Sequence, residues 1–334
     1  MDPRARPTEE KETYLPPAAL SALHDDQIIR DNRVMDVRLN AKHLFAPYNY
    51  TSAGPSKGTT GRFVDALNDW FGVPQDVLEQ IKSIGQLLHV SCLMLDDIQD
   101  NSPLRRGQHA AHVVYGQAQT INTSAFLIAN VMKEASKLGS PECINIVFDG
   151  VQECFIGQSY DMFWRDELIC PTENKYMDMV AKKTGGLFSL LARLMIECGQ
   201  RNKQFNLLRL TSLLGQFYQI RDDLMNLTIK EYTDQKGFCE DLDEGKFSYL
   251  IIFVWNMGGQ DSLDLQKHFN KRDRDKSMAI EDKQRVWRSW PGTMLSDSRR
   301  RSLIISKSRL RMRSGCSRWL LESLTGSSGS SSIS

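Results

Sequence analysis

Apolar residues recur every three or four positions through most of the chain, which is the spacing of an α-helix that buries one face. Segments with this spacing lie at about residues 25–51, 62–71, 73–95, 120–138, 142–161, 175–184, 187–198 and 205–227. Few segments alternate apolar and polar residues, as a half-buried strand would. The pattern therefore predicts an all-α fold, a helical bundle around a deep pocket.

Prolines and glycines mark where these helices are expected to break. Pro47 is predicted to end the first helical segment, and the Gly-, Pro- and Ser-rich residues 52–61 are predicted to form a flexible loop. Residues 73–95 are interpreted as two helices. Gly185 and Gly186 would let a substrate chain or another backbone approach closely, because glycine has no side chain.

Two of the predicted helices end in aspartates. Asp96, Asp97 and Asp100 follow one apolar run, and Asp222 and Asp223 follow another. Asp96 and Asp100 share a helix face, and carboxylates this close repel one another unless a positive charge lies between them. Mg²⁺ prefers oxygen ligands and keeps part of its shell for waters and phosphate oxygens. Two such helices facing one cavity would suit a metal-bridged polyanion.

One acidic motif alone is more simply interpreted as a solvated helix end, and the second motif favours a site. Arg105 and Arg106 lie one or two turns beyond the first aspartates. Their guanidinium groups match the oxygens of a diphosphate. The residues alone therefore indicate a metal and diphosphate site.

Composition is typical of a globular protein, with 334 residues, 41% of them hydrophobic and 25% charged. No run of about eighteen apolar residues occurs, and the N-terminus lacks the apolar stretch of a signal peptide. The seven cysteines are scattered, which favours reduced, buried thiols over disulfides or zinc sites. A cytoplasmic protein with no stable membrane insertion and no nucleic-acid partner is predicted.

Charge is distributed unevenly along the chain. Residues 299–334 hold eight Lys or Arg and one acid, a balance of +7, so residues 1–298 carry 34 basic and 40 acidic residues, a balance of −6. Residues 1–20 are predicted to form a flexible arm, 21–260 the main domain, and 261–334 an atypical basic, Ser- and Gly-ending tail. A disordered or non-native tail is favoured over an anion-binding patch.

Six stretches in order, from Leu88 and His89 through DDIQDNSPLRRG, GQSYDMFWRD, KKTGGLF and QIRDDLMNL to KGFCEDLDEGKFS, resemble a known enzyme family. The chain is similar to the trans-prenyl diphosphate synthases, most of all to the fungal geranylgeranyl diphosphate synthases. The resemblance implies an isoprenoid-synthase-type bundle with a deep central cavity. It also implies Mg²⁺-dependent condensation of isopentenyl diphosphate with an allylic diphosphate, and a homodimer.

The resemblance assigns roles to particular residues. The five aspartates would be catalytic, with Asp96, Asp100 and Asp222 as direct ligands of two to three Mg²⁺ ions. Lys57, His89 and Arg106 would bind isopentenyl diphosphate. The residues implied for the allylic diphosphate are Arg105, Lys183, Lys236 and Lys246, with hydrogen bonds from Thr184, Gln219 and Asn226.

Two features bear on activity and product length. Thr60 stands where the family usually has an arginine for isopentenyl diphosphate, which predicts weak binding of that substrate. Ser91 and Cys92, one turn before the first aspartates, are small and are expected to form a channel floor with room beyond a farnesyl chain. A C20 product, geranylgeranyl diphosphate, for diterpenoid or meroterpenoid biosynthesis is the resulting prediction.

Two other interpretations remain. Thr60 and the atypical tail would also fit a weak or inactive partner subunit of an active synthase. A terpene cyclase also uses an aspartate-rich helix, but its second motif would need Ser or Thr and then Glu at set places after Asp222. Asn226 and Lys230 stand there instead, which disfavours a cyclase.

Overall fold

The computed structural model describes residues 42–55, 58–228, 239–271, 281 and 283. The predicted arm at 1–20 and most of the predicted tail lie outside these residues, as do the substrate-binding candidates Lys57 and Lys236. Helices make up nearly all of the described chain, and its two strands have two residues each. The prediction of an all-α fold is confirmed.

The helices follow one another with short connections. Their bounds are α2 Lys42–Ala53, α3 Thr59–Phe71, α4 Gln75–Gln99, α5 Ala111–Tyr115, α6 Gln117–Ser136, α7 Pro141–Glu167, α8 Glu173–Lys183, α9 Gly185–Cys198, α10 Leu208–Thr228, α12 Glu240–Glu244, α13 Tyr249–Met257 and α14 Gly259–Lys271. No helix in the described part of the chain is long and apolar enough to cross a membrane.

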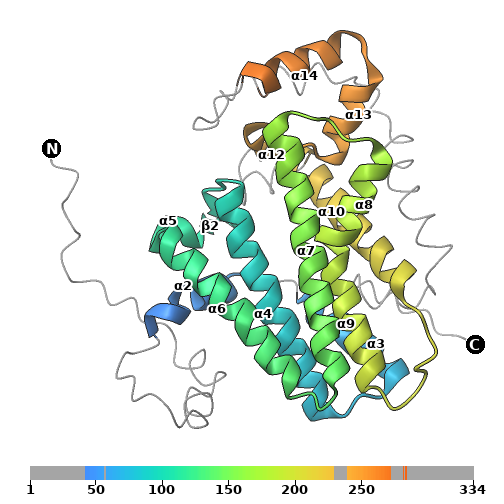
Figure 1. Cartoon of the computed structure of the whole chain (residues 1–334). Coiled ribbons are helices and arrows are strands. Elements are labelled where there is room, and N and C mark those ends of the chain that lie inside the picture. The colour runs from blue at the N-terminus through green and yellow to red at the C-terminus, as the bar shows by residue number, and fades with distance from the viewer. Residues whose placement is uncertain (1–41, 56–57, 229–238, 272–280, 282, 284–334) are drawn as a thin grey trace, which may run out of the picture. The chain divides into compact units, whose positions relative to one another are not determined.

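The centre of the bundle is built on α4. Figure 1 shows α4, α6, α7 and α9 running alongside one another, and α4 contacts both α6 and α9. Ile81, Ile84 and Leu88 of α4 are fully buried at intervals of three and four residues, which is the helical spacing of the sequence pattern, and Met94 is fully buried further along the helix. Burying such side chains, at about 1.5–3 kcal/mol each, is the main force that holds α4 in the bundle.

Two predicted helix boundaries are wrong. Pro47 lies inside α2, where the helix continues to Ala53, and Thr51 Oγ1 donates a hydrogen bond to the Pro47 carbonyl 2.9 Å away. Proline removes only one donor, and this position is in the second turn of a short helix, so the helix tolerates it. The two helices predicted within 73–95 are one helix, Gln75–Gln99, because Pro74 is its N-cap and nothing after it interrupts the apolar spacing.

A short hairpin follows α4 directly. Strands β1 Leu104–Arg105 and β2 Gln108–His109 pair antiparallel, and the two residues between them have positive φ, 57° at Arg106 and 80° at Gly107. Two positive φ values in a two-residue loop are the geometry of a type I′ turn. Arg106 adopts a conformation that favours glycine, so the hairpin fixes this side chain at some conformational cost.

A second apolar cluster supports the chain after α10. Phe247, Trp255 and Phe269 contact one another through their rings at 5.1–5.6 Å between centroids, and they come from the α12–α13 connection, α13 and α14. Leu265 of α14 belongs to the same cluster. The cluster holds α12 and the following Lys246 close to α10, which α12 and α13 contact.

Glycines bring α9 and α10 into close backbone contact. A Cβ atom added to Gly215 of α10 would lie 2.5 Å from the Cα of Gly185, the first residue of α9. The prediction that Gly185 lets another backbone approach is therefore confirmed. This crossing sets the position of α10, and with it the position of Asp222 two turns further on.

Replacing Gly215 with alanine should force α10 away from α9. Gly215→Ala is expected to lower the free energy of unfolding by about 1–3 kcal/mol, the usual cost of overpacking. The measurement is urea-induced unfolding, monitored by circular dichroism. Gly61→Ala is the control, because an added Cβ there meets nothing within 4 Å, and it should be neutral or stabilising by up to about 1 kcal/mol. Equal effects of the two substitutions would contradict the close contact.

Candidate active site

The carboxyl ends of α4 and α10 face a cavity of about 520 Å³. Its polar end carries acids, cations and amides from several helices, and its other walls are largely apolar. The apolar lining includes Leu88, Cys92, Leu93, Cys154, Phe155, Leu187, Phe188 and Tyr218. A charged end joined to an apolar pocket is suited to a ligand with an anionic head and a hydrocarbon chain.

The two aspartates of each adjacent pair have different environments. Asp96 and Asp222 both line the cavity, and their side chains are 20% and 46% exposed. Asp97 is 1% exposed and Asp223 is 2% exposed. All four lie at one end of the bundle, where the two helices end. Only Asp96 and Asp222 both line the cavity and have appreciably exposed side chains.

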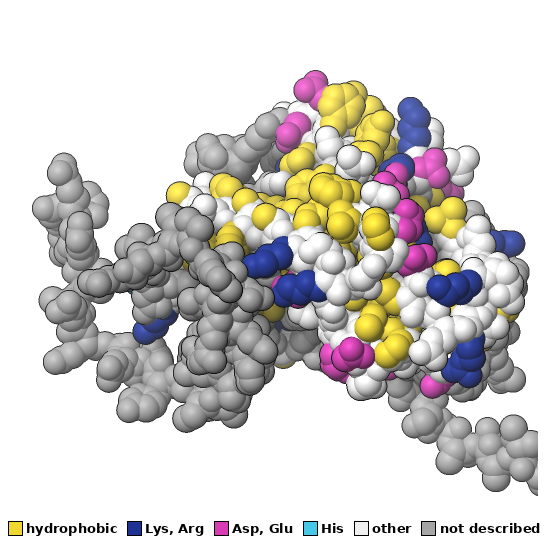
Figure 2. All heavy atoms as spheres, turned by 60° about the horizontal axis from the view of Figure 1, so that its bottom comes forward, with side chains coloured by type: hydrophobic (Ala, Val, Ile, Leu, Met, Phe, Trp, Pro, Cys, Tyr) yellow, Lys and Arg dark blue, Asp and Glu magenta, His cyan; other side chains and the backbone are white. Residues whose placement is uncertain are grey.

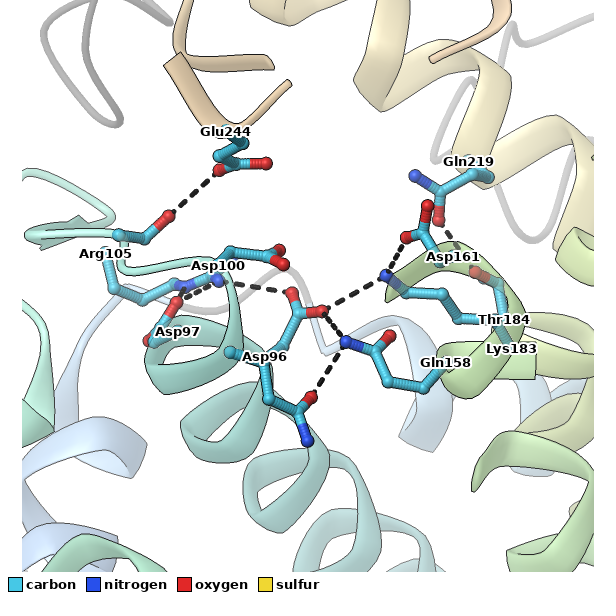
Figure 3. Close-up of polar contacts among 12 residues, drawn as sticks. Asp96, Asp97, Asp100, Arg105, Gln158, Asp161, Lys183, Thr184, Gln219 and Glu244 are labelled. Carbon is cyan, nitrogen blue, oxygen red and sulfur yellow. Dashed lines mark hydrogen bonds and ion pairs between the residues drawn. The ribbon is translucent and has the colours of Figure 1, made fainter. Parts of the chain in front are cut away.

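Asp96 is held by a cation and an amide from α7 and α8 (Figure 3). Lys183 Nζ lies 3.2 Å from Oδ1 of Asp96, and Gln158 Nε2 donates to the same oxygen at 3.1 Å. Arg105 Nη2 lies 3.6 Å from Oδ2. The carboxylate therefore faces the cavity with positive charge on both sides.

The buried partner Asp97 is fixed by the hairpin. Arg105 donates to Asp97 Oδ1 through Nε at 2.7 Å and also through Nη2. Burial disfavours the charged guanidinium, but Asp97 and then Asp96 raise the pKa of Arg105 above its ordinary value. Arg105 lines the cavity as predicted for a diphosphate contact, although it is already paired with an acid.

Asp223 is saturated by hydrogen bonds from the protein. Its oxygens accept from the Tyr176 hydroxyl at 2.5 Å, the Gln219 amide at 2.9 Å and the backbone N–H of Tyr249 at 2.9 Å. These donors come from α8, α10 and α13, so the carboxylate ties three helices together. Asp223 is thus suited to supporting its neighbour Asp222.

Asp100 is paired with an arginine that sequence reasoning did not select. Arg165 Nη1 donates to Asp100 Oδ1 at 2.6 Å. Burial, together with the carboxylates of Asp96 and Glu244, raises the pKa of Asp100 to about 7. Ser102 Oγ donates to Glu244 at 3.1 Å, which brings α12 to the end of α4 (Figure 3). Negative charge is therefore concentrated where the two acidic motifs meet.

Two buried lysines offset part of this charge. Lys183 Nζ lies 2.6 Å from Asp161 of α7, and the carboxylates of Asp161 and Asp96 raise its pKa against the effect of burial. Lys246 is 8% exposed, and the carboxylates of Asp241 and Asp161 likewise raise its pKa well above the ordinary value although burial opposes this. Both lysines line the cavity and stay charged at neutral pH.

The donor set fits a hard divalent cation. Carboxylate oxygens from α4, α10 and α12 surround one end of the cavity, where Asp96, Asp222, Asp223 and Asp241 line the wall. In the part of the chain that the structure describes, no three His, Cys, Asp or Glu side chains already form a closed metal cluster. Asp96 and Asp222 are the carboxylates best placed to hold Mg²⁺ together with a ligand's phosphate oxygens.

The predicted hydrogen-bond donors lie at the same end. Thr184 Oγ1 donates to Gln219 at 2.9 Å (Figure 3), and all three predicted residues, Thr184, Gln219 and Asn226, line the cavity. The Nδ2 of Asn226 is buried and has no hydrogen-bond acceptor among the described residues. An amide donor of this kind at a cavity wall suits a phosphate oxygen. Their contacts with substrate stay a prediction.

The residues predicted for the second substrate lie nearby. His89, Arg106 and Thr60 all line the cavity. Burial and then the positive charges of Arg106 and Arg105 lower the pKa of His89 to about 4, so the imidazole is neutral at pH 7. A neutral imidazole can still donate one hydrogen bond to an anion. This second anion site stays a prediction.

Of the two residues predicted to form the channel floor, Ser91 and Cys92, only Cys92 lines the cavity. Burial raises the pKa of the Cys92 thiol to about 12. Ser91 is fully buried and donates to the Ser124 carbonyl of α6 at 3.1 Å. Successive helix residues point about 100° apart, which explains why these neighbours face different helices. The prediction that Ser91 forms part of the floor is therefore wrong.

Four residues at this end were missed as site candidates. Gln158, Asp161 and Arg165 come from the GQSYDMFWRD stretch of α7, and Tyr176 comes from α8. Polar residues at positions 158, 161 and 165 recur at helical spacing on one face, and this was the available signal for the first three. Tyr176 lies in an ordinary amphipathic helix, and nothing in its local sequence marks it.

Comparison with known proteins identifies the family. The sequence model of the polyprenyl synthetase family matches residues 41–284. This match covers most of the chain and includes both acidic motifs and the cavity wall, so the chain belongs to the polyprenyl synthetase family. It is a prenyltransferase-type enzyme. The family generally depends on Mg²⁺ and uses isopentenyl and allylic diphosphates.

The chain is also similar to several curated fungal enzymes. Variediene synthase of Aspergillus brasiliensis is 40% identical over 297 residues, which cover 86% of this chain and 42% of that protein. Sesterterpene synthase btcA of Colletotrichum orbiculare is 49% identical over 222 residues, 65% of this chain and 31% of that protein. Bifunctional sesterterpene synthase astC of Talaromyces wortmannii is 44% identical over 245 residues, 73% and 32%.

These relatives correct the predicted function. The prediction of a geranylgeranyl diphosphate synthase is wrong, because the relatives are terpene synthases of a combined cyclase and prenyltransferase kind. The chain spans only about a third of the length of the curated relatives it matches. The motifs that led to the prediction lie within the matched region and carry no information on the rest of these longer relatives.

The low pKa of His89 predicts an acid-sensitive fold. In the unfolded chain a histidine takes up a proton at about pH 6.5, but in the folded protein His89 takes it up only at about pH 4. The contribution of neutral His89 to the free energy of unfolding is therefore complete above pH 6.5 and is lost as the pH falls toward 4. At pH 5 the loss should be about 2 kcal/mol, since one pKa unit is about 1.4 kcal/mol. Urea unfolding at pH 7.5 and pH 5.0 measures it.

The comparison is made between the unaltered protein and His89→Gln. The variant should lose about 2 kcal/mol less than the unaltered protein on acidification. His109→Gln, which changes an exposed histidine of the hairpin, is the control. Equal losses in all three proteins would show that His89 is not buried in its neutral form.

Proposed function

We propose that this chain is the chain-elongating part of a terpene synthase system. It would condense isopentenyl diphosphate with an allylic diphosphate and supply the linear polyprenyl diphosphate that a cyclising part converts to a terpene. The observation that carries the proposal is the meeting of two acidic helix ends, with Asp96 and Asp222, at one cavity that is charged at one end and apolar at the other. The supply of a product to a cyclising part is supported by the relatives, which are named sesterterpene synthases, one of them bifunctional.

The charged end is suited to binding and ionising the allylic diphosphate. Bound Mg²⁺ would supply Lewis-acid stabilisation of the departing diphosphate. Lys183, Arg105 and Lys246 bring positive charge to the same place. Each interacts with a carboxylate of the protein, and a bound diphosphate would compete with that carboxylate for the cation. Charges fixed in a water-poor cavity stabilise developing negative charge without reorganising.

The apolar walls are suited to the carbon chain. Phe188 and Tyr218 stack with their ring centroids 5.5 Å apart, and Leu88 and Leu187 extend the same lining. Such walls would exclude water from the allylic cation until the isopentenyl double bond attacks it and a proton is lost. Cys92 leaves space at one turn before Asp96.

A homodimer remains part of the proposal. Hydrophobic side chains gather at the centre of the face drawn in Figure 2, with charged ones around them. Large apolar side chains that are 36–50% exposed occur along α5, α6 and α7, namely Val113, Val114, Tyr115, Ile121, Phe126, Phe148, Ile156 and Phe163. An exposed apolar face of this kind supports association with a second copy. Sedimentation equilibrium of the purified chain tests it, and a monomer would exclude it.

The direct test is product analysis. The purified chain is incubated with Mg²⁺, isopentenyl diphosphate and either dimethylallyl or farnesyl diphosphate, and the products are analysed with and without phosphatase. Linear prenyl alcohols that appear only after phosphatase treatment, and that vanish with EDTA, are expected. Cyclic hydrocarbons without phosphatase would show that this chain itself cyclises, and no product would favour a non-catalytic partner.

Asp222 should be essential for this reaction and unimportant for folding. Its side chain is 46% exposed and forms an ion pair with the adjacent Arg221 at 3.1 Å. Asp222→Asn is expected to lower kcat at least about a hundredfold, because it removes one charged group from the metal and diphosphate site, with little change in unfolding free energy. Asp149→Asn is the matched control, an exposed aspartate 2.9 Å from Arg193. A similar loss of activity in both variants would contradict the assignment.

Thr60 should limit the binding of isopentenyl diphosphate. It lies in the cavity wall near His89 and Arg106 and has no charge to offer a phosphate. Thr60→Arg should lower the KM for isopentenyl diphosphate about tenfold to a hundredfold, the value of one charge-assisted hydrogen bond of about 1.5–3 kcal/mol. The KM for the allylic substrate should change little. Thr60→Gln is the uncharged control, and an equal effect of both substitutions would refute an electrostatic role.

A further inference from the structure

Arg165 and Asp100 form an ion pair that no step of the proposed reaction uses. Arg165 lies in the last turn of α7, and Asp100 is the C-cap residue of α4. Nη1 of Arg165 donates to Oδ1 of Asp100 at 2.6 Å. The two side chains are 12% and 6% exposed, so solvent and salt screen this pair far less than a surface ion pair.

The pair lies beside the cavity without lining it. Asp96 and Gln99, from the same turn of α4, are in the cavity wall, but among the residues that the structure describes neither Asp100 nor Arg165 is. The third aspartate of the first motif is therefore turned toward Arg165. One of its oxygens accepts a short, charge-assisted hydrogen bond, and that oxygen is not available to a cation at the same time.

A second carboxylate is within reach of the same guanidinium. Nε of Arg165 lies 3.5 Å from Oδ1 of Asp166, whose side chain is 46% exposed. A guanidinium has five N–H donors, so a small rotation can exchange one carboxylate for the other. Asp100 is the stronger partner of Arg165, because its oxygen lies closer to the guanidinium and its side chain is better shielded from solvent than that of Asp166.

We propose that Arg165 is the internal counter-ion of Asp100, which it holds while no metal is bound and releases toward Asp166 when a divalent cation binds. The proposal rests on the proposed function, which places Mg²⁺ at the neighbouring Asp96, and it adds Asp100 as a further ligand once Arg165 has released it. Arg165 is a positioning residue in this scheme. It opposes Mg²⁺ binding in two ways, by occupying an oxygen of Asp100 and by repelling a second positive charge near it.

Removing the charge of Arg165 should therefore strengthen metal binding. Arg165→Gln should bind Mg²⁺ about tenfold more tightly than the unaltered protein, as expected for loss of one nearby like charge. The probe is Mg²⁺ alone, measured by isothermal titration calorimetry and by the rise in melting temperature on adding Mg²⁺. Arg165→Lys keeps the charge and should bind Mg²⁺ as the unaltered protein does. A merely structural role of Arg165 predicts weaker Mg²⁺ binding in both variants.

Asp166 allows the exchange itself to be tested. Asp166→Asn removes the second carboxylate at an exposed position. It should weaken Mg²⁺ binding severalfold, because Arg165 then lacks a charged partner to move to when it leaves Asp100. Combined with Arg165→Gln, the same substitution should have no effect on Mg²⁺ binding. Additive effects of the two substitutions would overturn the exchange.

The outcomes separate this inference from the proposed function. If the unaltered chain forms linear prenyl diphosphates and binds Mg²⁺, but Arg165→Gln binds it no more tightly, the counter-ion role is wrong and the proposed function stands. If no variant binds Mg²⁺, the counter-ion role is likewise wrong. If product formation is absent or does not need Mg²⁺, the proposed function fails, and the calorimetric comparison still decides whether Arg165 opposes a cation at Asp100.

Discussion

Repulsion among carboxylates is the constraint on which the arrangement of this bundle depends. Two apolar helices end in aspartates at one cavity, and α12 adds further acids there. Like charges at this distance in a poorly solvated place destabilise the folded chain unless cations lie between them. The chain supplies these cations from other elements, with Arg105 on the hairpin, Arg165 on α7 and Lys183 at the end of α8. These ion pairs join the ends of α4, α7 and α8 to one another.

The two members of each adjacent aspartate pair lie in different surroundings. Asp97 and Asp223 are almost completely buried, and their oxygens accept hydrogen bonds from Arg105 or from Tyr176 and its neighbours. Their partners Asp96 and Asp222 point into the cavity. A carboxylate saturated by protein donors is a poor metal ligand but a rigid anchor, and rigidity of the support is what keeps the exposed neighbour in place.

Helical periodicity was enough to predict the fold class and the ends that carry aspartates, because burial of one apolar face determines both. It failed at Pro47 and in residues 73–95, where local breakers were given more weight than the continuous apolar face that tertiary packing buries. It also could not find Tyr176, whose contact with Asp223 joins residues 47 apart. Such a contact depends on how helices cross, and the crossing is set by close approaches such as that of Gly215 and Gly185.

The predicted product was wrong for a different reason. The motifs around Asp96 and Asp222 were the basis for predicting diphosphate chemistry, and they carry no information on what happens to the product afterwards. Elongation and cyclisation were treated as alternatives for one active site, and the missing cyclase motif after Asp222 was counted against a terpene synthase. The relatives are about three times as long as the matched part, so both activities can belong to one protein without sharing a cavity. A single site's residues therefore constrain its reaction far more tightly than they constrain the final metabolite.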